Sequence, residues 1–159
     1  MALKGVPAFY LPALLASEND IKSFSKTGQR RDLNREKFKS ENLSAILNNP
    51  ESNANKNLKY LRNAMEVRSE LKQFHPCSEM KCLSKGRSDI VVIKRGKGPE
   101  SVFAIHNMTE NKINYQLNDN DLPGIDDKDF NMRDFLTSTK YNWTNISLDP
   151  FQVVWLRAL

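Results

Sequence analysis

The stretch "GVPAFYLPALLA", residues 5–16, is strongly apolar and lies near the start of this 159-residue chain. Its first half, with Val6, Phe9 and Tyr10, is typical of a buried strand that Pro12 ends or bends. A strand that is apolar on both faces belongs inside a parallel sheet, where other strands lie beside it. Because its partners are missing from this sequence, we expect further chain to precede it, as in a larger α/β enzyme.

A helical pattern occupies the middle of the chain. Between Asn53 and Phe74, apolar residues recur at steps of three and four, which predicts an amphipathic helix of about six turns. Leu61, Met65 and Leu71 are expected to be its core positions. A shorter helix is predicted over residues 41–47.

After Pro76 the pattern changes to short β-like runs bounded by Gly, Pro, Asn and Asp. The runs are "SEMKCLS", "DIVVIKRG", "SVFAIHNMT", "KINYQLN", "RDFLTS" and "FQVVWLRAL". Such spacing predicts an antiparallel sandwich. The fold class is therefore α+β, helices plus an antiparallel β-sandwich, with residues 1–75 as one part and 76–159 as a β-sandwich domain.

Composition argues against several classes of protein. The net charge of +5 is spread along the chain, so the basic arm of a typical nucleic-acid binder is absent and no nucleic-acid partner is expected. No run approaches the roughly 18 apolar residues of a membrane helix, and no membrane partner is expected. We interpret the N-terminus as carrying no targeting segment, which predicts a cytoplasmic protein.

No metal or cofactor is expected either. Cys77 and Cys82 have poor spacing for a metal site and are predicted to be reduced thiols. The acidic residues of 118–129 lack the regular spacing of a calcium loop. Trp155 is expected in the core. Trp143 lies near a loop, and whether its ring contacts a sugar stays an open question.

A basic cluster, "GQRRDLNREKF", occupies residues 28–38, with four basic and two acidic side chains around Asn34. Two interpretations remain open. Arg30, Arg31, Asp32 and Arg35 form either an ordinary surface ion-pair cluster or part of a ligand site.

Three stretches, "KGVPAFYLPALLASEND", "TGQRRDLNREKF" and "LRNAMEVRSELKQFHP", resemble the C-terminal part of the sucrose phosphorylase group in the α-amylase clan. The resemblance covers nearly the whole chain. Gly5, Pro7, Phe9 and Tyr10 match the pattern that marks the eighth strand of the clan's (β/α)₈ barrel. The resemblance thus implies the end of a (β/α)₈-barrel glycoside enzyme followed by its C-terminal domain.

The same resemblance implies a substrate loop. Residues 11–38 would follow the eighth strand, on the side of the barrel where active sites form. Arg35 matches the last arginine of an R-D-x-N-R motif that helps to hold the glucosyl unit, a task suited to the fixed donors of a guanidinium. The resemblance implies that Asp32 orients Arg35 and that Asn34 braces the loop, with Arg31 among the substrate-binding residues.

In the family, an Asp nucleophile, a Glu acid/base and a further Asp carry out double displacement. All three would lie upstream of Met1, so no catalytic residue is expected here and the chain alone is expected to be inactive. The implied partners are a glucosyl substrate and phosphate, while water, glycerate and other acceptors stay open. The alternative is a free-standing sugar-binding or protein-interaction β-module. A homodimer through residues 1–16 is also expected, because their apolar side chains need cover.

Overall fold

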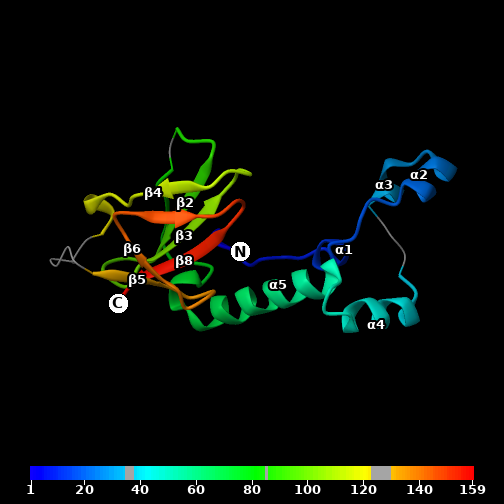
Figure 1. Ribbon diagram of the computed structural model, residues 1–159, viewed down its shortest axis with the longest axis horizontal. Coiled ribbons are helices and arrows are strands. Elements are labelled where there is room, and N and C mark those ends of the chain that lie inside the picture. The colour runs from blue at the N-terminus through cyan, green and yellow to red at the C-terminus, as the bar shows by residue number, and fades with distance from the viewer. Residues whose placement is uncertain (35–37, 85, 123–129) are drawn as a thin grey trace. The chain divides into compact units, whose positions relative to one another are not determined.

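The computed structural model describes residues 1–34, 38–84, 86–122 and 130–159. The chain forms two compact units, shown as ribbons in Figure 1. The first unit combines Met1–Val6 with Glu66–Leu159, and the second is Pro7–Met65. Helix α5, Asn53–Glu70, contributes residues to both units.

The first unit is built from antiparallel strands in two sheets. One sheet has six strands in the order β1-β2-β3-β8-β5-β6, and the other pairs β4 with β7. The bounds are β1 Met80–Cys82, β2 Ile90–Arg95, β3 Val102–Asn107, β4 Ile113–Tyr115, β5 Asn131–Asp134, β6 Lys140–Asn142, β7 Ile146–Leu148 and β8 Val153–Ala158. A short 3₁₀ helix, η2, covers Asp119–Asp121.

A hydrophobic core joins the two sheets. Alternate residues of β2, β3 and β8 share one face, because side chains along a strand point to opposite sides in turn. The buried core residues are Ile90, Val92, Phe103, Ile105, Leu117, Leu122, Met132, Trp143, Ile146, Leu148, Val154 and Leu156. Both sheets contribute, so the predicted α+β fold with an antiparallel sandwich is confirmed. Trp143 stacks on Phe130 within this core and is only 5% exposed, which excludes its ring as a surface platform for sugar.

The opposite face of the six-stranded sheet packs on the end of α5 and on η1, Lys72–Phe74. Phe74 is 1% exposed, and its ring centroid lies 4.5 Å from that of Trp155. The buried face of α5 near this end consists of Ala64, Arg68 and, just beyond the helix, Leu71. The expected core is therefore right at Leu71 but wrong at Leu61 and Met65, which are only partly buried. At this end the helix is held by Ala64 and Arg68.

Asp134 ends β5 earlier than the sequence pattern predicts. The predicted strand ran over residues 133–138, whereas β5 is Asn131–Asp134. The fully buried carboxylate of Asp134 accepts hydrogen bonds from the backbone of Trp155 at 2.7 Å and from the hydroxyl of Thr137 at 2.6 Å. The backbone N–H of Phe135 still donates to the carbonyl of Trp155 at 2.9 Å, and the chain then turns away from β8.

The second unit is helical. Its elements are α1 Leu11–Leu14, α2 Ile21–Thr27, α3 Arg30–Leu33, α4 Ser40–Asn48 and the first part of α5. The predicted helix over residues 41–47 is confirmed by α4, and the predicted helix from Asn53 is confirmed to Glu70. The strand predicted at the start is wrong for this chain: residues 6–10 are not in a strand, although the backbone of Tyr10 is extended. A parallel strand needs a neighbour for its ladder, and no described strand pairs with this segment.

None of the described helices has both the length and the apolarity that a membrane crossing requires. Cys77 and Cys82 are free and exposed, in agreement with the predicted thiols.

His106 on β3 predicts a pH dependence of stability. Burial lowers the pKa of this imidazole below its usual 6.5, so the folded chain favours its neutral form more than the unfolded chain does. The unfolded chain binds the proton more readily, and stability is therefore lost as the pH falls below about 6.5. We expect the urea midpoint to drop between about pH 7.5 and pH 5.5, and to drop less in His106→Phe. Equal drops in the two proteins would contradict this assignment.

Candidate functional site

The candidate site is the segment from Leu11 to Asn34, which carries α1, α2 and α3. Pro12 lies in the first turn of α1, where its missing N–H and fixed φ suit a helix start. Asp20 caps α2 by accepting hydrogen bonds from the backbone N–H of Ser23 at 2.9 Å and from its hydroxyl at 2.6 Å. These bonds lower the pKa of the Asp20 carboxyl. Gly28 ends α2 with φ +67°, a conformation that favours glycine.

The structure brings three of the four predicted substrate-binding residues together on and after α3. The carboxylate of Asp32 accepts a hydrogen bond from the hydroxyl of Thr27 at 2.6 Å, and the Nε of Arg31 lies 4.0 Å from it. Asn34 holds the loop through its backbone, since its carbonyl accepts from the hydroxyl of Tyr10 at 3.1 Å. Arg35, the fourth residue, lies outside the described residues.

Tyr10 and Thr27 were missed as site residues by reasoning from the sequence. Tyr10 belongs to the strand-eight pattern and Thr27 lies just before the basic cluster, but neither sequence position signals its hydrogen bond. A second backbone bond closes the same segment, because the N–H of Asp20 donates to the carbonyl of Leu33 at 2.7 Å. The loop that carries the predicted motif is thus tied at both Leu33 and Asn34.

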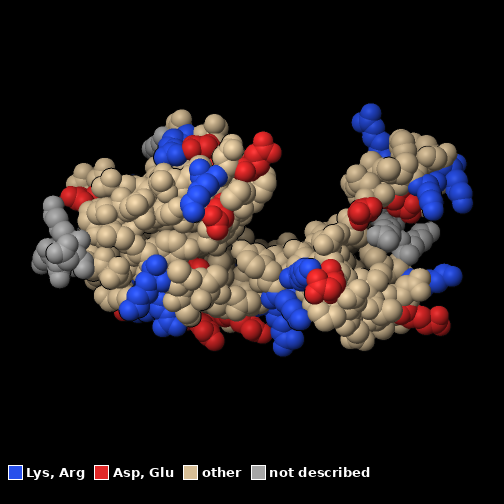
Figure 2. Space-filling model, viewed as in Figure 1, with Lys and Arg blue, Asp and Glu red and all other residues tan. Residues whose placement is uncertain are grey.

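The segment is rich in positive charge. Between residues 22 and 39 the sequence has seven Lys and Arg against two Asp and Glu. In Figure 2 several blue side chains stand on the part of the chain that forms α2 and α3. Arg31 is 66% exposed, which leaves its guanidinium accessible to a ligand, whereas Asp32 is engaged by Thr27. The arrangement suits anions and hydroxyl groups, which guanidinium donors bind with paired hydrogen bonds.

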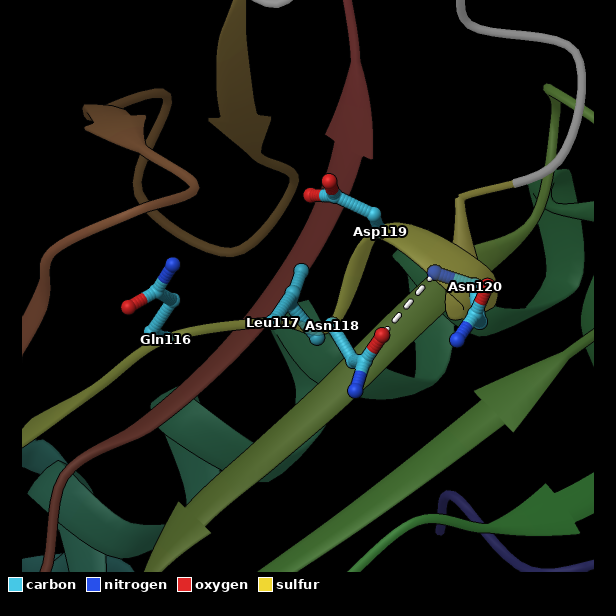
Figure 3. Close-up of a pocket in the computed structure, with 5 residues that line it drawn as sticks. All are labelled: Gln116, Leu117, Asn118, Asp119 and Asn120. Carbon is cyan, nitrogen blue, oxygen red and sulfur yellow. Dashed lines mark hydrogen bonds between the residues drawn. The ribbon is translucent and has the colours of Figure 1, made fainter.

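The described residues contain no group of three or more His, Cys, Asp and Glu that could hold a metal ion. A hollow of about 500 Å³ does lie beside η2 in the first unit, lined by Gln116, Leu117, Asn118, Asp119 and Asn120. Figure 3 shows that these side chains point in different directions, with Gln116 standing apart from the others. The side chain of Asn118 accepts from the backbone N–H of Asn120 at 3.0 Å. We therefore assign this hollow no function.

Comparison with known proteins gives the chain its relatives. No protein-family model matches it. It is 33% identical over 110 residues to glucosylglycerate phosphorylase of Allomeiothermus silvanus, a match covering 69% of this chain and 20% of the relative. It is 24% identical over 157 residues to glucosylglycerate phosphorylase of Escherichia coli K12, covering 99% of this chain and 26% of the relative. The chain thus spans a fifth to a quarter of the length of these two proteins.

Solved structures support the fold. Trehalulose synthase from Pseudomonas mesoacidophila superposes with a TM-score of 0.55 at 12% identity, over 73% of this chain and 19% of that protein. An α-amylase from Anoxybacillus gives a TM-score of 0.53 at 16% identity, over 69% of this chain and 24% of that protein. At such identities the likeness concerns the fold alone.

The fold matches the C-terminal part of a (β/α)₈-barrel enzyme with its β-domain, as the likeness to the trehalulose synthase and the α-amylase indicates. The curated glucosylglycerate phosphorylases confirm the resemblance to the sucrose phosphorylase-like group that the sequence predicts.

Proposed function

We propose that the chain is the C-terminal portion of a retaining α-glucosyl phosphorylase that acts on glucosylglycerate with phosphate. The observation that carries this proposal is the match to the E. coli glucosylglycerate phosphorylase, which extends over 99% of the chain and so includes the candidate site. The balanced reaction would convert glucosylglycerate and phosphate into glucose 1-phosphate and glycerate.

The charge of the candidate site supports this choice of substrate. Phosphate and the carboxylate of glycerate are both anions, and residues 22–39 carry an excess of five positive charges, seven against two. In our proposal Arg35 holds the glucosyl unit, Asp32 and Asn34 shape the loop around it, and Arg31 contributes a charge toward the anionic groups. Paired, charge-assisted hydrogen bonds from the guanidinium groups would fix the orientation of the bound substrate.

The catalytic carboxylates would come from outside this chain. Double displacement needs a nucleophile and an acid/base about 5 Å apart on either side of the scissile bond. Asp32, the acid within the motif, instead accepts a hydrogen bond from the hydroxyl of Thr27 at 2.6 Å. Residues 1–75 would supply the terminal barrel strand, the substrate loop and helices, and residues 76–159 the C-terminal domain. By itself the chain is proposed to be inactive.

A chimeric enzyme tests the proposal. Residues 1–159 would replace the matching region of the E. coli relative, 26% of its length. We expect the chimera to form glucose 1-phosphate from glucosylglycerate and phosphate. We expect no glucose 1-phosphate from the chimera when phosphate is left out, and none from the isolated chain. Release of free glucose regardless of phosphate would favour a glycosidase instead. Sugar binding by the isolated chain, together with an inactive chimera, would favour the free-standing β-module.

The isolated chain is expected to dimerise through its first sixteen residues. Val6 is 81% exposed and Leu11 is 56% exposed, so these two apolar side chains lack cover. A two-fold dimer buries the same patch on both subunits. Light scattering at high micromolar concentration should show a dimer that becomes a monomer when residues 1–16 are deleted. A monomeric full chain, or a dimer that survives the deletion, would contradict this prediction.

A further inference from the structure

Two arginines hold the start of the chain on the first unit. The Nη2 of Arg68 donates to the carbonyl of Gly5 at 2.8 Å, and its Nη1 donates to the carbonyl of Met1. The Nη1 of Arg95 donates to the carbonyl of Ala2 at 3.0 Å. Every one of these acceptors is a backbone oxygen, so the contacts recognise the main chain of residues 1–5.

Both guanidiniums are buried. Arg95 has no exposed surface and Arg68 is 8% exposed. Within the described ranges, neither forms a salt bridge with a carboxylate. The central guanidinium carbon, Cζ, lies 5.5 Å from the ring centroid of Phe74 in Arg68 and 5.7 Å from it in Arg95. Burying a cation is costly unless it is well hydrogen-bonded. The guanidinium groups of Arg68 and Arg95 therefore bind backbone carbonyls in place of a carboxylate.

Further contacts define the path of the bound segment. The side chain of Ala2 is 2% exposed, and the N–H of Gly5 donates to the carbonyl of Pro76 at 3.3 Å. Gly5 has φ +107°, which a residue with a Cβ adopts only with strain. Arg95 also binds the main chain of a second segment, because its Nη2 donates to the carbonyl of His75 at 2.8 Å. Residues 1–5 therefore lie in a fitted site.

We propose that Arg68 and Arg95 are positioning residues that clamp residues 1–5, and with them the first residue of the strand-eight pattern, onto the β-sandwich unit. Gly5 begins "GVPAFY", and Tyr10, five residues on, binds the loop that leads to Arg35. In the complete enzyme the clamp would set the position at which this strand begins. That consequence rests on the proposed function, whereas the clamp itself does not.

The full chain tests the clamp by amide hydrogen exchange at Gly5 and by trypsin cleavage after Lys4, whose side chain is exposed. Arg68→Gln should accelerate both by about tenfold or more, the effect of losing one or more hydrogen bonds to a charged group. Arg68→Lys keeps the charge without the fork and should restore only part of the protection. Lys72→Gln is the matched control, because it removes a surface cation that pairs with Glu100 at 2.8 Å.

Amides of β3 and β8 should keep their protection in Arg68→Gln. Unchanged exchange at Gly5, full rescue by Arg68→Lys, or equal acceleration throughout the sheet would overturn the clamp. In the chimera, Arg68→Gln should lower kcat about tenfold while leaving the KM for phosphate unchanged, and Lys72→Gln should change neither. An inactive chimera that carries the unaltered residues 1–159 would refute the proposed function and leave the exchange result standing. An active chimera whose kcat is unchanged by Arg68→Gln would refute the positioning role.

Discussion

Replacing Arg35 by alanine in the chimeric enzyme is expected to lower kcat/KM for the phosphorolysis of glucosylglycerate by about 100- to 1,000-fold. A guanidinium that grips two substrate oxygens makes two charge-assisted hydrogen bonds, together worth about 3–4 kcal/mol of transition-state stabilisation. Arg35→Lys should recover part of the loss, since an ammonium keeps the charge but not the planar fork. Initial rates of glucose 1-phosphate release measure the effect.

Arg30→Ala is the control for Arg35→Ala. Arg30 is an exposed arginine of the same cluster, on α3, and is not among the residues that the motif assigns to the substrate. Its removal should change kcat/KM by less than about threefold, as expected for a surface charge. Equal, small effects of the two substitutions would show that the cluster is a surface ion-pair network, the alternative that the sequence leaves open.

Phe74→Ala is expected to lower the free energy of unfolding of the sandwich unit by about 3–5 kcal/mol, the range for large-to-small changes in a core. Phe74 is 1% exposed and packs on Trp155, and both clamp arginines lie over its ring. The substitution removes this packing and leaves a cavity where η1 meets the sheet. Urea unfolding followed by tryptophan fluorescence gives the change.

Phe151→Ala is the matched control, because Phe151 is 66% exposed. It should cost less than about 0.5 kcal/mol, as surface substitutions usually do. A loss below about 1 kcal/mol for Phe74→Ala would show that the end of α5 and η1 are not part of the cooperative core.

The sandwich was predictable because its strands carry local signals. The β-branched runs of β2, β3 and β8 alternate between the two faces of the sheet, and turn residues bound them. The short strands β6, Lys140–Asn142, and β7, Ile146–Leu148, were missed, although β1 and β4, which are equally short, lie within predicted runs. The predicted strand over residues 6–10 failed for a different reason, because pairing depends on neighbours that the pattern of one segment does not contain.

The candidate site was predictable only in part. Arg31 and Asp32 could be predicted as site residues because they are neighbours within one short sequence motif. The hydrogen bond between Tyr10 and Asn34 joins residues 24 apart, and the bonds from Arg68 to residues 1–5 span more than 60 positions. Such contacts depend on the folded path of the chain. For the same reason the helical period placed the core at Leu61 and Met65, whereas the buried residues of α5 are Ala54, Ala64 and Arg68.

The most direct test of the central claim is the rate at which the chimera releases glucose 1-phosphate from glucosylglycerate and phosphate. The reference proteins are the E. coli relative and a version of it that lacks the matching 26% of its length. If residues 1–159 supply the substrate loop and C-terminal domain of such an enzyme, the chimera should reach within about tenfold of the relative, a difference of only 1.4 kcal/mol in the barrier. A folded chimera that is no faster than the shortened relative would contradict the account.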